Sequence, residues 1–231
     1  MSISVTDKRI KERIKNGEKT TIIINIKYPN FESDTHKSLC DKMNDFYFCV
    51  AEKYFIHAKN KLPPRLKNTE TPAEISMNYT VSFKDNNMVC LVTDIMYSHG
   101  DRTKSRRFSQ LWSIEKSDII SWNEVLKSDR NSRKMLLNLI KEKARENAEN
   151  PSFKYFAGYE RRLSSNFDLH NCFFVPKGIC FFVNAGIMAP VKLGACNFVL
   201  PFSRISEVVL TGYLPESGGK ALQRQNIVNN I

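Results

Sequence analysis

The amino-acid sequence predicts an α+β fold in which antiparallel sheets carry helices packed on one face. Three observations lead to this prediction. Apolar and polar residues alternate without exception over 75–83, which is typical of a strand with one buried and one wet face. A helical spacing of apolar residues covers 34–59, between an early strand and a later series of strands. Two phenylalanine-rich segments, 172–175 and 179–183, flank a Pro-Lys-Gly turn and indicate a hairpin.

The N-terminal part is expected to hold one strand and one long helix. The strand is 20–28, where isoleucines recur at every second position, and it is expected to end at Pro29. Ser33 and Asp34 then offer a helix cap. The helix of 34–59 ends before a Pro-Pro pair, and its buried stripe consists of Leu39, Met43, Phe46, Val50 and Tyr54.

The middle of the chain predicts three strands joined as an antiparallel meander. They are 75–83, 88–97 and 108–114, and the short connections between them favour neighbouring strands. The second strand is apolar on both faces. The polar stretch 98–107 between the second and third strands is predicted to be a loop.

The remaining elements follow from caps, periodicity and turn residues. Ser121 and Glu124 form a capping-box pattern ahead of a short helix, and a longer helix is expected over 131–148. A mixed helical segment covers 153–163. In the hairpin of 172–183, Gly178 is expected to supply a positive φ angle, and 184–190 is a loop of small and apolar residues. A last strand at 197–202 and a helical turn at 203–209 precede a tail that frays from Thr211.

These elements suggest an N-terminal strand–helix portion (1–66), an α+β portion (67–215) and a tail (216–231), with the whole forming one compact unit. The 231 residues are 42% apolar, which is enough to bury a core. The formal charge of +11 favours an acidic or phosphate-bearing partner.

The chain ends and the cysteines suggest a location. The first residues contain no continuous apolar segment of the kind that directs export, and the longest uncharged stretch, 178–191, is too short to cross a bilayer. The six cysteines form no C-x-x-C pair and mostly stand in apolar runs. We therefore expect a cytoplasmic protein with free thiols and no membrane span.

Several motifs resemble one known family in their order and spacing. The early strand runs into Ile-Lys-Tyr-Pro-Asn-Phe (26–31) and then into the long helix. Near the C-terminus the sequence reads Cys-Phe-Phe-Val-Pro-Lys-Gly-Ile-Cys-Phe-Phe-Val-Asn (172–184), Ile-Met-Ala-Pro (187–190), Gly-Ala (194–195) and Phe-Val-Leu-Pro-Phe-Ser (198–203). Over roughly 5–210 this pattern resembles the C-terminal domain of the anti-sigma-V factor RsiV and its bacterial relatives. Ser98-His99-Gly100, ahead of a strand ending in Trp112, also fits that pattern.

The resemblance implies a binding role. Members of that family occur as the outer part of a membrane anti-sigma factor that binds lysozyme, as accessory domains beside a peptidoglycan deacetylase, and, in many more cases, as stand-alone proteins with no assigned role. The resemblance therefore also implies an uncharacterised domain family of unknown function. Pro190 matches the proline of the family's Ala-Pro loop, whereas its aromatic neighbours are replaced here by small or aliphatic residues. A chain of charge +11 repels basic lysozymes at long range, so lysozyme itself is not the expected partner.

The most favoured hypothesis is a non-enzymatic protein-binding module. A rigid sheet would hold two loops, 98–105 and 184–192, where a protein partner docks. Apolar residues in a glycine-punctuated loop favour an exposed docking patch, although the same loop would also suit a cap over the core. The predicted contact residues are Ser98, His99, Ile187, Met188, Pro190 and Lys192.

Two alternatives stay open. A basic run with aromatics behind it is a pattern that grips single-stranded nucleic acid, and here it consists of Arg102, Lys104, Arg106 and Arg107, with Phe108 and Trp112 following. The other alternative is an accessory role in cell-wall or lysozyme-related processes, which requires export.

The sequence carries none of the common catalytic signatures. There is no nucleophile elbow, no H-E-x-x-H, no Walker loop and no G-x-G-x-x-G. His170, Cys172 and Cys180 are one ligand short of a closed zinc site and lack its usual spacing. We therefore expect no catalytic residue, no cofactor and no metal.

Overall fold

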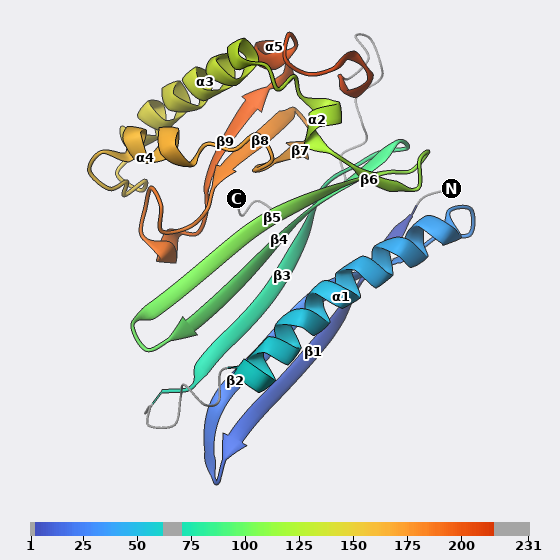
Figure 1. Cartoon of the computed structure of the whole chain (residues 1–231), viewed down its shortest axis with the longest axis vertical. Helices are drawn as coiled ribbons and strands as arrows, with labels where there is room; N and C mark the ends of the chain where they lie inside the picture. Colours follow the sequence, from blue (N-terminus) through green and yellow to red (C-terminus); the bar gives the residue numbers. More distant parts are fainter. Residues whose placement is uncertain (1–2, 62–70, 215–231) are drawn as a thin grey trace.

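The computed structural model describes residues 3–61 and 71–214, and its α+β architecture confirms the predicted fold class (Figure 1). The strands and helices run in this order: β1 (Ser4–Asn16), β2 (Lys19–Glu32), α1 (Lys37–Lys61), β3 (Ala73–Lys84), β4 (Met88–His99), β5 (Arg102–Ser113), β6 (Asp118–Ile120), α2 (Trp122–Val125), α3 (Arg130–Ala148), α4 (Tyr159–Asn166), β7 (Cys172–Val175), β8 (Gly178–Val183), the 3-10 turn η2 (Val191–Leu193), β9 (Cys196–Pro201), α5 (Phe202–Ile205) and the 3-10 turn η3 (Thr211–Tyr213).

The strands form two sheets. The large sheet has the order β1-β2-β3-β4-β5-β6, and the small sheet has the order β7-β8-β9. Only the β2–β3 pair of the large sheet is parallel, because α1 carries the chain back across the sheet between these two strands. The predicted meander is confirmed as β3–β4–β5, and the predicted hairpin is confirmed as β7–β8.

Strand β1 was not predicted, because it is an edge strand of the large sheet and its sequence is mostly polar and charged. Most of the side chains of β1 are exposed, and most of the exposed ones are charged, while Ile10 and Ile14 pack toward the core beneath α1. Pro29 does not end β2 as expected. It pairs with Asp7 of the edge strand, and β3 has already left β2 after Ile26, so the missing N–H costs no hydrogen bond to β3.

Helix α1 covers one face of the large sheet (Figure 1). Its buried residues pack on isoleucines of β2 and on alternate residues of β3 and β4. At one end of this layer the indole N–H of Trp112 donates to the Tyr47 hydroxyl at 3.3 Å, and both side chains are buried. Asn44 accepts from the Phe31 N–H and donates to the Phe31 carbonyl, which fastens the helix to β2.

The opposite face of the sheet carries the second half of the chain. Met88, Cys90 and Val92 of β4 point into a core built from the small sheet, α3 and the short helices, while Val89 and Leu91 point toward α1. This explains why β4 is apolar on both faces.

Two helices in this half begin with side-chain caps, and the first cap was predicted from the sequence. The capping box of Ser121 and Glu124 is present, and α3 begins behind Asp129, whose carboxylate accepts from the backbone N–H groups of Asn131 and Ser132. Two hydrogen bonds from Ser132 lower the pKa of Asp129 below its ordinary value of 3.8. The hydroxyl of Ser132 has the larger effect, and its backbone N–H adds to it.

Gly178 has a different role from the one predicted. Its φ angle is not positive; instead, a Cβ atom at this position would clash with the backbone carbonyl oxygen of Leu200. Close approach of β9 therefore requires glycine here.

The polar stretch 98–107 is not a loop. Strands β4 and β5 pair up to His99 and Arg102, so the turn consists of Gly100 and Asp101 alone. No helix within 3–61 and 71–214 is long and apolar enough to cross a membrane. The expected boundary at 66/67 and the expected tail of 216–231 lie outside the described residues.

Candidate functional site

The structure brings together the two segments that the sequence singled out. The segment between β8 and β9 reaches from the small sheet toward β5, and η2 lies against that strand (Figure 1). The amide oxygen of Asn184, at the start of this segment, accepts from the backbone N–H of Arg107 at 2.7 Å. Residues about 80 positions apart are thus neighbours in space. We call the exposed parts of both segments the loop–hairpin surface: residues 184–193 and the paired ends of β4 and β5, 96–107.

Arg107 makes the contacts that connect the two sheets at this surface. Its guanidinium makes a two-pronged ion pair with Asp94 on β4, with N–O distances of 2.8 and 2.7 Å, and it also donates to the Asn197 side chain on β9 at 2.7 Å. It lies 5.8 Å from the centre of the Phe182 ring. The side chain is only 17% exposed, so Arg107 joins the two sheets, and its charge is already neutralised within the fold.

The sequence did not identify the partners of Arg107. Asp94 is the lone charged residue within an otherwise apolar strand, and that signal was present in the sequence. No such signal marks the two asparagines, because their use depends on how the sheets pack.

The predicted loop residues divide into buried and exposed groups. Met188 and Ala189 are buried in the core, and the Met188 carbonyl accepts from the Phe156 N–H at 2.8 Å. Met188 is therefore not part of the accessible surface, as its apolar side chain caps the core instead. Ile187 and Pro190 are half-buried.

Exposure is concentrated at η2. Lys192 is exposed, and Leu193 is half exposed at 50%. Leu193 was not among the predicted contacts, although it directly follows the predicted segment.

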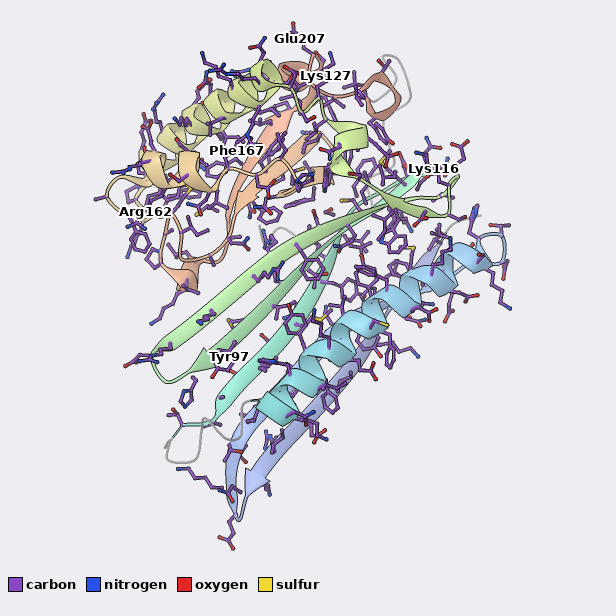
Figure 2. The ribbon with its side chains drawn as sticks, in the orientation of Figure 1. Tyr97, Lys116, Lys127, Arg162, Phe167 and Glu207 are labelled. Carbon is purple, nitrogen blue, oxygen red and sulfur yellow. The ribbon has the colours of Figure 1, made fainter. Side chains whose placement is uncertain are left out.

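An aromatic cluster borders the other side of this loop, and sequence reasoning missed it. Tyr155 and Tyr159 pack with ring centres 5.0 Å apart, and Phe153 beside them is 42% exposed. Arg162 of α4, labelled in Figure 2, donates to the Ile187 carbonyl at 3.4 Å. The high density of aromatics over 153–159 was the available signal.

On the hairpin, the cations lie in a row. The register places Arg102, Lys104 and Arg106 on the face of β5 that looks toward α1, and all three are exposed. None of them forms an ion pair within the part of the chain that the structure describes. Phe108 on the same face is half-buried, but Trp112 is only 2% exposed and cannot stack on a base.

Ser98 and His99 are half-buried near the turn and point to opposite faces of β4. Met96, two residues before Ser98, is 40% exposed and faces the side of the sheet from which the 184–193 segment approaches. The hairpin therefore exposes apolar Met96 on one face and the three unpaired cations on the other.

The three side chains considered as metal ligands differ in burial. His170 is exposed beside Asp168, whereas Cys172 and Cys180 are buried, and burial raises the pKa of Cys180 to about 12. A thiol with a raised pKa is a poor nucleophile and a poor ligand at neutral pH. In residues 3–61 and 71–214 no three His, Cys, Asp or Glu side chains gather as a metal-ligand set.

Comparisons with known proteins address the fold. A scan against protein-family models finds no match, and a search of curated proteins finds none either. Among solved structures, a member of the DUF3298 family from Bacteroides fragilis aligns with a TM-score of 0.67 and 13% identity, over 91% of this chain and 94% of that one. A DUF3298 family protein from Pseudomonas aeruginosa aligns with a TM-score of 0.65 and 12% identity, over 92% and 97%.

The chain has the fold of DUF3298 proteins. Both alignments span nearly the whole length of each chain, so the sheet, the crossover helix and the second half all belong to the shared DUF3298 architecture. That family consists of uncharacterised domains, which agrees with the expectation of a domain family without an assigned role.

Proposed function

We propose that this chain is a non-enzymatic protein-binding module whose partner contacts the loop–hairpin surface. One observation carries the proposal. The hydrogen bond between the Arg107 N–H and the Asn184 side chain joins two segments that are far apart in sequence. Their surface exposes apolar Leu193 and Met96, with Met96 on one face of the hairpin and the unpaired cations on the other. Exposed apolar groups within a polar rim are typical of protein-interaction sites.

The resemblance to the RsiV C-terminal domain supports a protein as the class of ligand. The charge of +11 favours an acidic partner over a basic one such as lysozyme. A cytoplasmic location is part of this proposal. Cell fractionation that finds the chain outside the cell would favour the accessory role in cell-wall processes instead.

Affinity capture with matched variants tests the proposal. Leu193→Asp places a charge on the exposed η2 turn of the loop–hairpin surface, while Ile56→Asp makes the same kind of change on α1, where Ile56 is 47% exposed. We expect a partner that wild type and the Ile56 variant retain to be lost with the Leu193 variant. Equal capture by all three proteins would reject this surface as the docking site.

A second candidate function is binding of single-stranded nucleic acid, favoured by the exposed, unpaired row of Arg102, Lys104 and Arg106. Affinity for an oligonucleotide would then fall steeply between low and high salt and would fall again in a variant with serine at all three positions. Salt-independent binding, or binding that survives the triple change, would exclude this role for the row.

A further inference from the structure

We propose that the partner contributes an extended acidic segment, which adds to the outer edge of β5 as a new strand of the large sheet. This inference rests on the proposed function, since it names the part of the partner that the loop–hairpin surface receives. It also specifies main-chain pairing as the mode of recognition.

The outer edge of β5 has no strand partner over most of its length. Strand β6 pairs with β5 only at Leu111, Trp112 and Ser113, and no other described strand lies beyond β5. The region from Arg102 to Gln110 therefore has a strand neighbour on one side only, namely β4.

One hydrogen bond shows which backbone groups face outward. The Arg107 N–H points away from β4, because it donates to the Asn184 side chain. Alternate residues of a strand present their N–H and C=O groups to the same edge, so Ser105 and Thr103 also face outward. The Asn184 side-chain oxygen occupies the position that a carbonyl oxygen of an added strand would take beside Arg107. An added strand therefore has to end before Arg107. The available edge is thus 102–106.

The side chains around this edge specify an acidic occupant. On one face of β5, Arg102, Lys104 and Arg106 are exposed and unpaired, so carboxylates at alternate positions of an added strand would lie opposite them. On the other face, the cross-strand neighbours would be the uncharged, half-buried Thr103 and Ser105, with exposed Met96 behind Ser105 on β4. This face favours uncharged, apolar residues at the positions between. The expected segment alternates acidic and apolar residues.

The same charges disfavour pairing between two copies of this chain. Edge-to-edge pairing of two β5 strands would bring both sets of cations together, and like charges across strands are destabilising. Charged side chains on an edge are a common device against such pairing. An acidic strand turns this repulsion into attraction.

A proline at Ser105 tests the main-chain contact directly. The Ser105 N–H faces away from β4, so Ser105→Pro removes an outward donor and leaves the β4–β5 hydrogen bonds in place. Ser105→Ala is the matched control, because it removes the same hydroxyl and keeps the N–H. The probe is a fluorescent nine-residue peptide that alternates glutamate and valine, titrated against the full chain.

We expect wild type and Ser105→Ala to bind this peptide with affinities within about threefold, and Ser105→Pro to bind about tenfold more weakly. A peptide with lysine in place of glutamate should not bind. Hydrogen exchange of wild type provides a readout independent of the proline variant: adding the acidic peptide should protect the amides of Thr103 and Ser105. Equal affinity of the two variants, protection only on the edge strand β1, or a preference for an oligonucleotide over the acidic peptide would overturn the inference.

The captured partner separates this inference from the proposed function. If Leu193→Asp abolishes capture and Ser105→Pro leaves it unchanged, the surface binds its partner without strand addition. If neither change affects capture, the proposed function itself fails.

Discussion

Replacing Arg107 by alanine tests whether this side chain holds the two sheets together. The change removes the two-pronged ion pair with Asp94, the hydrogen bond to Asn197 and the contact with the Phe182 ring. A hydrogen bond to a charged group contributes about 1.5–3 kcal/mol. Asp94 is 43% exposed, so water compensates part of its loss. We therefore expect the free energy of unfolding to fall by about 2–3 kcal/mol.

Urea unfolding followed by circular dichroism measures this loss, and a fall in Tm of about 4–12 °C should accompany it for a chain of this length. Arg106→Ala is the control. The Arg106 side chain is next to Arg107 in the sequence but is exposed and unpaired, so this change should alter the free energy of unfolding by no more than about 0.5 kcal/mol. Arg107→Lys keeps the charge without the planar fork and should lose about half as much as alanine. If Arg107→Ala and Arg106→Ala unfold at the same urea concentration, Arg107 does not join the sheets.

Three further predictions concern stability. Gly178→Ala should destabilise the fold by at least about 2 kcal/mol in urea unfolding, because the added methyl group meets the Leu200 carbonyl, and an unchanged midpoint would contradict that close approach. Met188→Ala should lower the free energy of unfolding by about 2–4 kcal/mol in the same assay and leave partner capture intact. If a folded Met188→Ala variant loses capture, Met188 contributes to binding after all. Asp129, whose pKa is lowered mainly by the Ser132 hydroxyl, stabilises the fold above pH 3.8, and this contribution disappears as the pH falls through its lower folded-state pKa. Asp129→Asn keeps a cap that does not titrate, so its stability should decline less than that of wild type below pH 4, and parallel curves would exclude this titration.

The fold was predictable where burial repeats with the period of a strand or helix. Strand β3 and helices α1 and α3 each place apolar residues on one face, and that regularity marks them in the sequence. Strand β1 shows only a weak signal, because an edge strand exposes most of its side chains. The first part of β5 looks like a loop because its residues are polar, yet cross-strand partners and solvent satisfy them within a sheet.

The candidate site was predictable only in part. The resemblance pointed to the 98–105 and 184–192 segments, and the structure places the second of them against β5, the strand that contains the end of the first. Burial of Met188 and exposure of Leu193 depend on how the loop folds over the core, which the local pattern of small and apolar residues does not determine. The role of Arg107 depends on Asp94 and Asn197, which are brought to it by two different sheets.

In the large sheet the spatial order of the six strands is the order of their synthesis. Each strand therefore pairs with a strand that the ribosome has already synthesised. No strand has to be inserted between two earlier ones. The hydrophobic side of β4 that faces away from α1 is the exception, since its cover comes from segments made up to 120 residues later. Until those segments have been synthesised, this apolar strip lacks its cover, and exposed apolar surface of this kind makes an incomplete chain prone to aggregate.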